Sequence, residues 1–109
     1  MKPFFANHFK HQLKKLMKRF PHAKEDLLLK IKTIDFKNEI HIGKSIYKVR
    51  IKSSDQNKGK SGSLRCYIYV YVNKDLLAPL CIYSKNQEES ISENQLQYHF
   101  DKIIEELIR

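Results

Sequence analysis

The sequence predicts an α+β domain in which helices pack against an antiparallel sheet. Residues 7–20 and 92–108 carry apolar side chains at helical spacing, and the stretch between 46 and 85 alternates apolar and polar residues as strands do. A chain of 109 residues can bury about two thirds of the surface that it exposes when unfolded. We therefore expect residues 1–109 to form a single domain: an N-terminal helical hairpin, a sheet of three to four antiparallel strands and a C-terminal helix.

The N-terminal third predicts two helices. Residues 7–20 place a stripe of apolar side chains opposite a face of lysines and one arginine; the stripe consists of Phe9, Leu13, Leu16, Met17 and Phe20. Pro21 ends this helix and suits the first turn of a second helix. The expected buried side of that second helix comprises Leu27, Leu28, Ile31 and Ile34. The segment Lys2–Phe5 is too short to decide whether it adds an edge strand.

Three strands are expected after a linking stretch at residues 35–45. They are Ile46–Lys52, Leu64–Val72 and a third from Leu77 or Leu80 to Ser84. The connection between the second and third strands is short and polar, which favours an antiparallel hairpin. Pro79 has no amide hydrogen, so we expect it at the start of the third strand or on an edge of the sheet.

Strand alternation gathers positive charge on one face of the expected sheet. Val49, Ile51 and Leu64 point to the core, whereas the opposite face receives Lys48, Arg50, Lys52, Arg65, Tyr67, Tyr83 and Lys85. The glycine-containing loop Asn57–Gly62 allows a tight turn that brings Lys58 and Lys60 toward the same face. Cationic groups and phenols that share one surface suit a polyanionic ligand.

The C-terminal helix has the clearest start signal in the chain. Ser92 and Gln95 have the spacing of a capping box, and Ile91 and Leu96 occupy the positions of a hydrophobic staple. The apolar stripe that follows consists of Leu96, Phe100, Ile103 and Leu107. This stripe must pack against the sheet, and we expect Tyr69 and Tyr71 to lie beneath it.

Charge is distributed unevenly along the chain. The formal net charge is +9; residues 1–60 hold 16 basic and 5 acidic side chains, and residues 61–109 hold 5 and 7. This asymmetry favours a nucleic acid or another acidic partner, because neutralised phosphates release counterions. A basic isoelectric point is also a common solubility device, so charge alone leaves both interpretations open.

Cysteine and histidine usage favours neither a disulfide nor a metal site. Cys66 and Cys81 both fall in expected strands without a CxxC pair, so we expect buried, reduced thiols. The five histidines are not expected to cluster, and no metal or cofactor is predicted. The sequence has no signal-peptide pattern and no run of about 20 apolar residues. We therefore expect no membrane contact and a cytoplasmic location.

Several segments together carry a family resemblance. A basic helix leads into Phe20-Pro21, and the strand Tyr47-Lys48-Val49-Arg50 and the loop Lys58–Gly62 follow. Arg65 then opens a tyrosine-rich strand, and Tyr83-Ser84-Lys85 ends the next one. In this order the segments resemble the RelE/ParE toxin superfamily of bacterial toxin–antitoxin systems, and most of all its HigB-like branch. The resemblance covers nearly the whole chain.

The resemblance implies a ribosome-dependent endoribonuclease that cuts translated mRNA without a metal. It also implies a small cognate antitoxin, often of the helix-turn-helix type, as partner. The positions that match catalytic residues of the family are Lys58, Lys60, Arg65 and Lys85, and the expected RNA contacts are Lys48, Arg50, Lys52, Tyr67 and Tyr83. Residues 86–90 contain no tyrosine or arginine of the kind that RelE-like enzymes carry there, so Tyr83 or Tyr67 is the candidate substitute.

The chemistry suits these residue types. The planar fork of Arg65 can hold two phosphate oxygens and stays charged at any working pH, so we assign Arg65 to the transition state. A lysine base needs a pKa below the ordinary value of about 10.4. Crowding by neighbouring cations favours such a decrease at Lys58, Lys60 or Lys85.

Two other functions compete with this interpretation. ParE-like relatives share the fold but bind DNA gyrase, and such a protein has no need to assemble the cations Lys58, Lys60, Arg65 and Lys85. A basic RNA-binding module without turnover would also carry this surface. The loop with Lys58 and Lys60 is otherwise a plain solvated turn, since it lacks the spacing of a P-loop.

Overall fold

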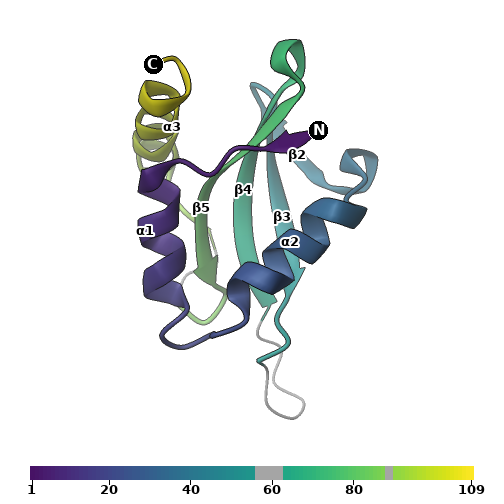
Figure 1. Ribbon diagram of the computed structural model, residues 1–109, viewed down its shortest axis with the longest axis vertical. Coiled ribbons are helices and arrows are strands. Elements are labelled where there is room, and N and C mark those ends of the chain that lie inside the picture. Colours follow the sequence, from purple (N-terminus) through teal and green to yellow (C-terminus); the bar gives the residue numbers. More distant parts are fainter. Residues whose placement is uncertain (56–62, 88–89) are drawn as a thin grey trace.

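The computed structural model describes residues 1–55, 63–87 and 90–109, which form three α-helices and one five-stranded sheet (Figure 1). The helices are α1 (Asn7–Leu16), α2 (Ala23–Thr33) and α3 (Glu93–Leu107), and short 3-10 helices cover Phe36–Asn38 and Val72–Lys74. The strands are β1 (Lys2–Pro3), β2 (Ile40–Gly43), β3 (Ile46–Lys52), β4 (Ser63–Tyr71) and β5 (Leu76–Ser84). Their order in the sheet is β1-β5-β4-β3-β2. The predicted α+β class is confirmed.

The sheet is larger than expected, and it is mixed rather than purely antiparallel. β1 runs parallel to β5, with Lys2 opposite Leu76. β2 lies in the stretch that was expected to be a linker, and it joins β3 through a turn in which Gly43, Lys44 and Ser45 have positive φ. Both strands are too short for their alternation to stand out in the sequence, so the prediction of three to four antiparallel strands was wrong in number and direction.

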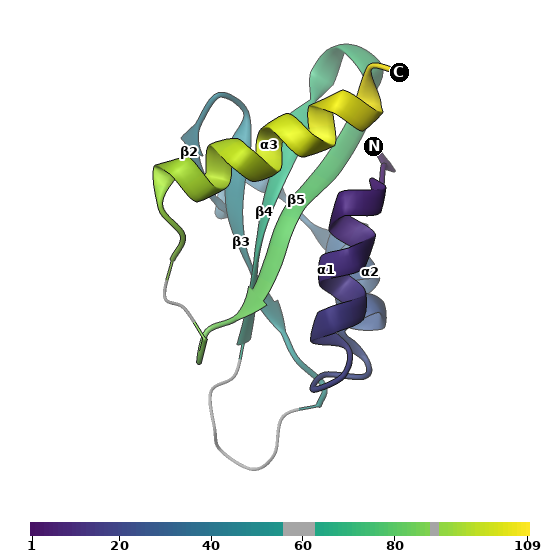
Figure 2. The same cartoon turned by 90° about the vertical axis from the view of Figure 1, so that its left-hand side faces the viewer.

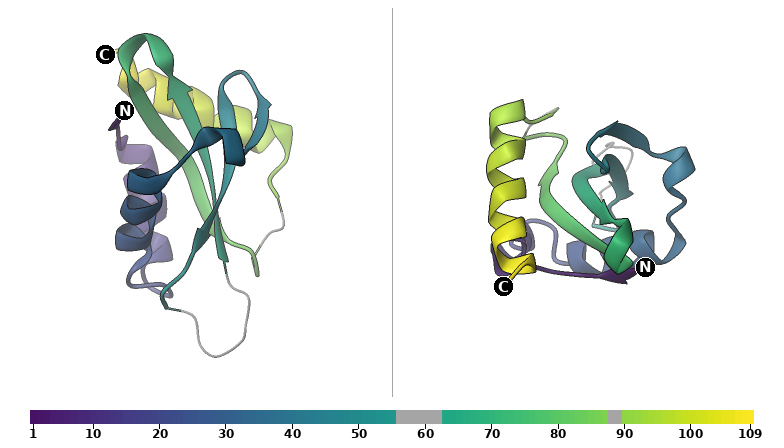
Figure 3. Two further views of the ribbon diagram at one scale, coloured as in Figure 1. Left: turned by 90° about the vertical axis from the view of Figure 1, so that its right-hand side faces the viewer. Right: turned by 90° about the horizontal axis from the view of Figure 1, so that it is seen from above.

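Helices cover both faces of the sheet. On one face α1 lies along β5 and α2 lies over β3, while α3 crosses the other face (Figures 2 and 3). The core between the sheet and the first two helices contains Phe9, Leu13, Leu27, Val49, Leu64, Ile68 and Leu80. Each N-terminal helix buries its stripe against a different strand, so the two do not pack along each other as the predicted hairpin would (Figure 1).

The N-terminal helices are shorter than predicted. α1 ends at Leu16 rather than Phe20, and residues 17–19 form a turn ahead of Pro21. Phe20 nevertheless stays buried, and its N–H donates to the carbonyl of Leu16 at 2.9 Å. α2 begins two residues after Pro21 and buries Leu27, but Leu28 is exposed, contrary to expectation.

Pro79 lies inside β5 rather than at its start. The pairing with β1 ends at Leu77, so at Pro79 β5 pairs only with β4 and is locally an edge of the sheet, as one of the two predictions had it. The register of β4 and β5 shifts beside Pro79, so that Tyr67 pairs with Cys81 and Ile68 pairs with Pro79. Leu80 is the extra residue of this bulge. Because a bulge interrupts the ladder of hydrogen bonds, it tolerates a residue that has no amide donor.

α3 begins as the sequence predicted. Ser92 Oγ accepts a hydrogen bond from the Gln95 N–H at 3.1 Å, and Gln95 Oε1 accepts one from the Ser92 N–H at 2.9 Å. These two bonds complete the capping box. Further along the helix, the ring of Phe100 lies edge-on to Tyr69, with 5.1 Å between centroids. The expected position of Tyr69 under this helix is therefore confirmed.

The end of α3 caps the start of α1. Ala6, at the N-cap of α1, offers no side-chain acceptor. Instead, the carboxylate of Glu106 accepts the N–H of Asn7 at 2.6 Å and the N–H of His8 at 3.0 Å. These bonds, chiefly the one from His8, hold the pKa of Glu106 below its ordinary value. A contact between residues about a hundred positions apart thus fixes where the first helix begins.

We expect Glu106→Ala to lower the free energy of unfolding at pH 7 by about 1 kcal/mol, the usual cost of losing a helix N-cap. The pKa of this carboxyl is lowered by folding, so its contribution is present above the unfolded pKa and is lost as the pH falls through the folded pKa. Urea denaturation should therefore show a deficit at pH 7 that disappears in acid. The exposed neighbour Glu105 provides the control variant Glu105→Ala. An equal deficit in both variants would contradict the cap.

Candidate functional site

Three adjacent strands bring cations and phenols together on the face that α3 crosses. Directly opposed residues form two rows across β3, β4 and β5: Lys48 with Tyr67 and Cys81, and Arg50 with Arg65 and Tyr83. Lys52 lies opposite Ser63 in the next row. Neighbouring strands are about 4.8 Å apart, so the three strands span roughly 10 Å. We call the set Lys48, Arg50, Lys52, Arg65, Tyr67 and Tyr83 the cationic face.

Arg65 is the central cation of this face and is buried. Only 8% of its surface is exposed, whereas Arg50 and Lys52 are exposed. Its Nη1 donates a hydrogen bond to Ser63 Oγ, two residues earlier on the same face of β4. Burying a guanidinium is costly unless its donors are satisfied, and this bond also fixes the direction of the side chain. Arg65 is therefore a charge held in one orientation.

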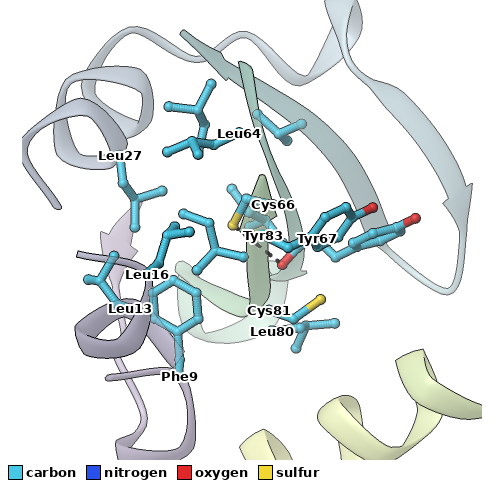
Figure 4. Close-up of a cluster of buried hydrophobic side chains, with 14 of the residues drawn as sticks. Phe9, Leu13, Leu16, Leu27, Leu64, Cys66, Tyr67, Leu80, Cys81 and Tyr83 are labelled. Atoms are coloured by element: carbon cyan, nitrogen blue, oxygen red, sulfur yellow. Dashed lines mark hydrogen bonds between the residues drawn. The ribbon is translucent and has the colours of Figure 1, made fainter. Parts of the chain in front are cut away.

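Tyr67 and Tyr83 form the aromatic part of the face. Their rings are stacked, with 6.4 Å between centroids and 27° between planes, and both are buried. Figure 4 shows the two rings side by side, pointing away from the core residues Phe9, Leu13 and Leu16. The pair separates the sheet core from the surface where the exposed cations lie.

Within the described residues, no carboxylate forms an ion pair with Arg50, Lys52 or Arg65 of this face. Among residues 1–55, 63–87 and 90–109, the ion pairs are the N-terminal amine with Asp75, His22 with Asp55, and Lys30 with Glu39. None of these pairs involves Arg50, Lys52 or Arg65. Several like charges on one surface create a positive potential that attracts polyanions.

The remaining predicted site residues divide into two groups. Lys85, half-buried, directly follows β5, and its backbone N–H donates to the Ser63 carbonyl at 3.2 Å. It therefore lies beside the strand that carries Arg65. Lys58 and Lys60, with the loop 57–62, lie outside the described residues. The strands thus bring together all five predicted RNA contacts and two of the four predicted catalytic residues.

Two carboxylates tie the end of β3 to the start of α2. Asp26 accepts the N–H and the hydroxyl of Ser54 at 2.9 and 3.1 Å. Asp55 accepts the N–H of His22 at 2.8 Å, and its other oxygen lies 2.6 Å from His22 Nδ1. The side-chain contact raises the pKa of His22 and lowers that of Asp55. The sequence pattern did not predict these bonds, because the partners come from different segments.

Two histidines meet, contrary to the prediction that none cluster. His8 of α1 and His99 of α3 lie 2.8 Å apart, from Nε2 to Nδ1. Burial is the main cause of a lowered pKa at both. They are 91 positions apart, and no local pattern marks either of them, so only the packing of α1 against α3 reveals the pair. The prediction of buried, reduced thiols agrees with the structure, since Cys66 and Cys81 are both buried and neither forms a disulfide within the described residues.

The described residues form neither a metal-binding cluster nor a membrane-spanning helix. No group of three or more His, Cys, Asp or Glu side chains in these ranges could hold a metal ion. No helix in the described part of the chain is long and apolar enough to cross a membrane.

Comparisons with known proteins gave a likeness in fold to solved structures. No protein-family model matches the sequence, and no curated protein does either. Among solved structures, the fold is similar to that of the Escherichia coli toxin RelE, determined as a double arginine-to-alanine variant in the free state. The match has a TM-score of 0.48 and 14% sequence identity, and it covers 95% of this chain and 94% of that one.

We expect the pKa values of three histidines to depart from the ordinary value, one upward and two downward. NMR titration of the imidazole rings should give a raised pKa for His22 and lowered values for His8 and His99. In Asp55→Asn the His22 pKa should fall, while the other two, which serve as internal controls, stay unchanged. Because folding raises the His22 pKa, the contact between His22 and Asp55 stabilises the fold at pH values below the pKa of His22 in the unfolded chain. This stabilisation is lost as the pH rises through the pKa of His22 in the folded chain. An unchanged His22 titration in Asp55→Asn would refute the contact.

Proposed function

We propose that this protein is the toxin of a bacterial type II toxin–antitoxin system, a ribosome-dependent endoribonuclease that cleaves translated mRNA. The observation that carries the proposal is the row of Arg50, Arg65 and Tyr83 on three adjacent strands. The order of sequence segments, which resembles the RelE/ParE superfamily and its HigB-like branch, points to the same activity. The partners are then mRNA, the ribosome and a cognate antitoxin, of the helix-turn-helix type in our proposal.

The proposed reaction needs three groups and no metal. The 2′-hydroxyl of the RNA gives up its proton and attacks the adjacent phosphorus, and the bond to the 5′-oxygen breaks. The 5′-oxygen takes up a proton, which leaves a 2′,3′-cyclic phosphate on one fragment and a 5′-hydroxyl on the other. A base, an acid and a group that stabilises the additional negative charge are required.

Arg65 suits the stabilising role. A guanidinium can donate two parallel hydrogen bonds to phosphate oxygens, and it stays charged throughout the reaction. The bond to Ser63 and the burial of Arg65 hold the charge in place before substrate arrives. A donor that needs no reorganisation stabilises a transition state more effectively than a flexible one.

Lysines and tyrosines are the candidates for proton transfer. Lys85 lies at the end of β5 beside this row, and Lys58 and Lys60 complete the proposed set. Tyr83 lies in the same row as Arg65 and is the candidate acid in place of a residue from 86–90, with Tyr67 as the alternative. Lys48, Arg50 and Lys52 are proposed to bind the RNA backbone.

An RNA-binding module without turnover is the second candidate. The burial of both phenols favours it, because Tyr67 and Tyr83 are 4% and 8% exposed and an acid must reach the leaving oxygen. Such a module would keep its affinity for RNA when the transition-state residue is removed. The two candidates therefore differ in how strongly Arg65 affects cleavage.

We expect Arg65→Ala to lower cleavage at least about 100-fold, as removal of one transition-state donor typically does. Arg65→Lys keeps the charge without the planar fork and should lie between wild type and Arg65→Ala. The measurement is induced expression in a bacterium with mapping of mRNA 5′ ends. Thermal unfolding of the purified variants separates loss of activity from loss of fold. Equal cleavage by Arg65→Ala and wild type would rule out this role for Arg65.

We expect Arg50→Ala to reduce the salt dependence of binding to single-stranded RNA. Each phosphate contact contributes about 0.7 to the slope of log affinity against log salt concentration, so one lost contact should decrease the slope by about that amount. Lys74→Ala is the matched control, since Lys74 is an exposed cation in the 3-10 helix after β4, beyond the opposite end of that strand. Identical slopes for both variants would show that Arg50 does not contact phosphate.

A further inference from the structure

A hollow of about 250 Å³ lies next to the cationic face, between β5, α1 and α3. Its lining includes Gln12, Cys81, Tyr83, Gln87, Gln95 and His99. Tyr83 belongs both to this lining and to the row that contains Arg65. The hollow is smaller than the 300 to 1,000 Å³ that is typical of drug-sized ligands, so it suits a single ring system.

Hydrogen bonds within the protein fix the orientation of two side-chain amides in this lining, those of Gln12 and Gln95. Gln12 donates from Nε2 to the Leu80 carbonyl at 3.0 Å, so its Oε1 remains as an acceptor. Gln95 accepts the Ser92 N–H at 2.9 Å through Oε1, so its NH₂ group remains as a donor. The hollow thus has both an acceptor and a donor on walls that come from different helices.

His99 adds a third polar group that is uncharged near pH 7. Its Nδ1 contacts His8, which leaves Nε2 as its second polar atom. If His8 donates the shared proton, Nε2 of His99 carries a proton; if His99 donates it, Nε2 is an acceptor. Burial lowers the pKa of His99 and so favours the neutral ring.

The lining distinguishes between classes of ligand. The cations lie on the sheet, whereas this hollow presents carboxamides, a neutral imidazole and the ring of Tyr83. An anion would find no positive charge in this set and would meet the Gln12 oxygen. A nucleobase instead offers donors and acceptors side by side on one edge, together with a flat face that stacks on aromatic rings.

We propose that the hollow between Gln12, Tyr83, Gln95 and His99 binds one base of the RNA strand whose phosphate lies at Arg65. This inference rests on the proposed function, and it adds a base-reading subsite to the phosphate site. The subsite makes cleavage depend on the identity of one nucleotide, with the Gln95 amide as the donor that reads an acceptor on the base.

Gln95→Glu tests the subsite without removing the helix cap. Glutamate keeps the oxygen that accepts the Ser92 N–H, and a capping box is equally satisfied by Glu or Gln at this position. The substitution replaces only the amide donor by a charged acceptor. Asn94→Asp is the matched control, since it adds the same charge one residue earlier, at an exposed position outside this lining.

The experiment is expression of wild type, Gln95→Glu and Asn94→Asp in a bacterium, with mapping of the mRNA ends that each produces. We expect wild type and Asn94→Asp to share one base preference near the cut, and Gln95→Glu to change that preference about 5- to 100-fold, the range of one base-reading contact. Cuts with the same base distribution in all three proteins would overturn the subsite but leave the nuclease function intact. No cuts by any of them would overturn both.

Discussion

The antiparallel register of β4 with its two neighbours is the constraint on which the rest depends. Because side chains alternate along a strand, the register that buries Leu64, Cys66 and Ile68 under the helices also sends Arg65 and Tyr67 to the other face. A slip of one residue would turn the core set toward the face that α3 crosses and place the charged set under α1 and α2. The hydrophobic core and the cationic face thus both depend on the same strand pairing.

Helix positions depend on contacts between distant segments. Glu106 of α3 caps α1, and Asp55 after β3 caps α2 through His22. Each bond satisfies an amide at a helix start that has no backbone partner within its own helix. The Glu106 cap connects the two faces of the sheet, since α1 covers one face and α3 crosses the other (Figure 2), and the Asp55 contact ties α2 to the end of β3. The walls beside the cationic face are therefore set by tertiary structure rather than by helix propensity.

The sequence predicted features that arise from local patterns. Alternation in β3 and β4 and the capping box at Ser92 are properties of a few consecutive residues, and the structure agrees with them. β1 has only two residues, and β2 becomes a strand only when β3 pairs with it. The contact of His8 with His99 likewise depends on how two helices pack. For the site, alternation was enough to place Arg50, Arg65 and Tyr83 on one face, but the adjoining hollow could not be predicted from it.

Arg65 itself is difficult to explain as a structural residue. Its guanidinium is buried on a central strand, and among the described residues its only hydrogen bond is to the neutral hydroxyl of Ser63, not to a carboxylate. Burying a charge without a counterion costs stability, and an apolar side chain of similar volume is often tolerated better at such positions. A protein that keeps the charge gives up stability there, as proteins often do at functional sites. A bound phosphate would supply a counterion that the described residues do not provide, so binding a phosphate group and neutralising Arg65 would be the same event.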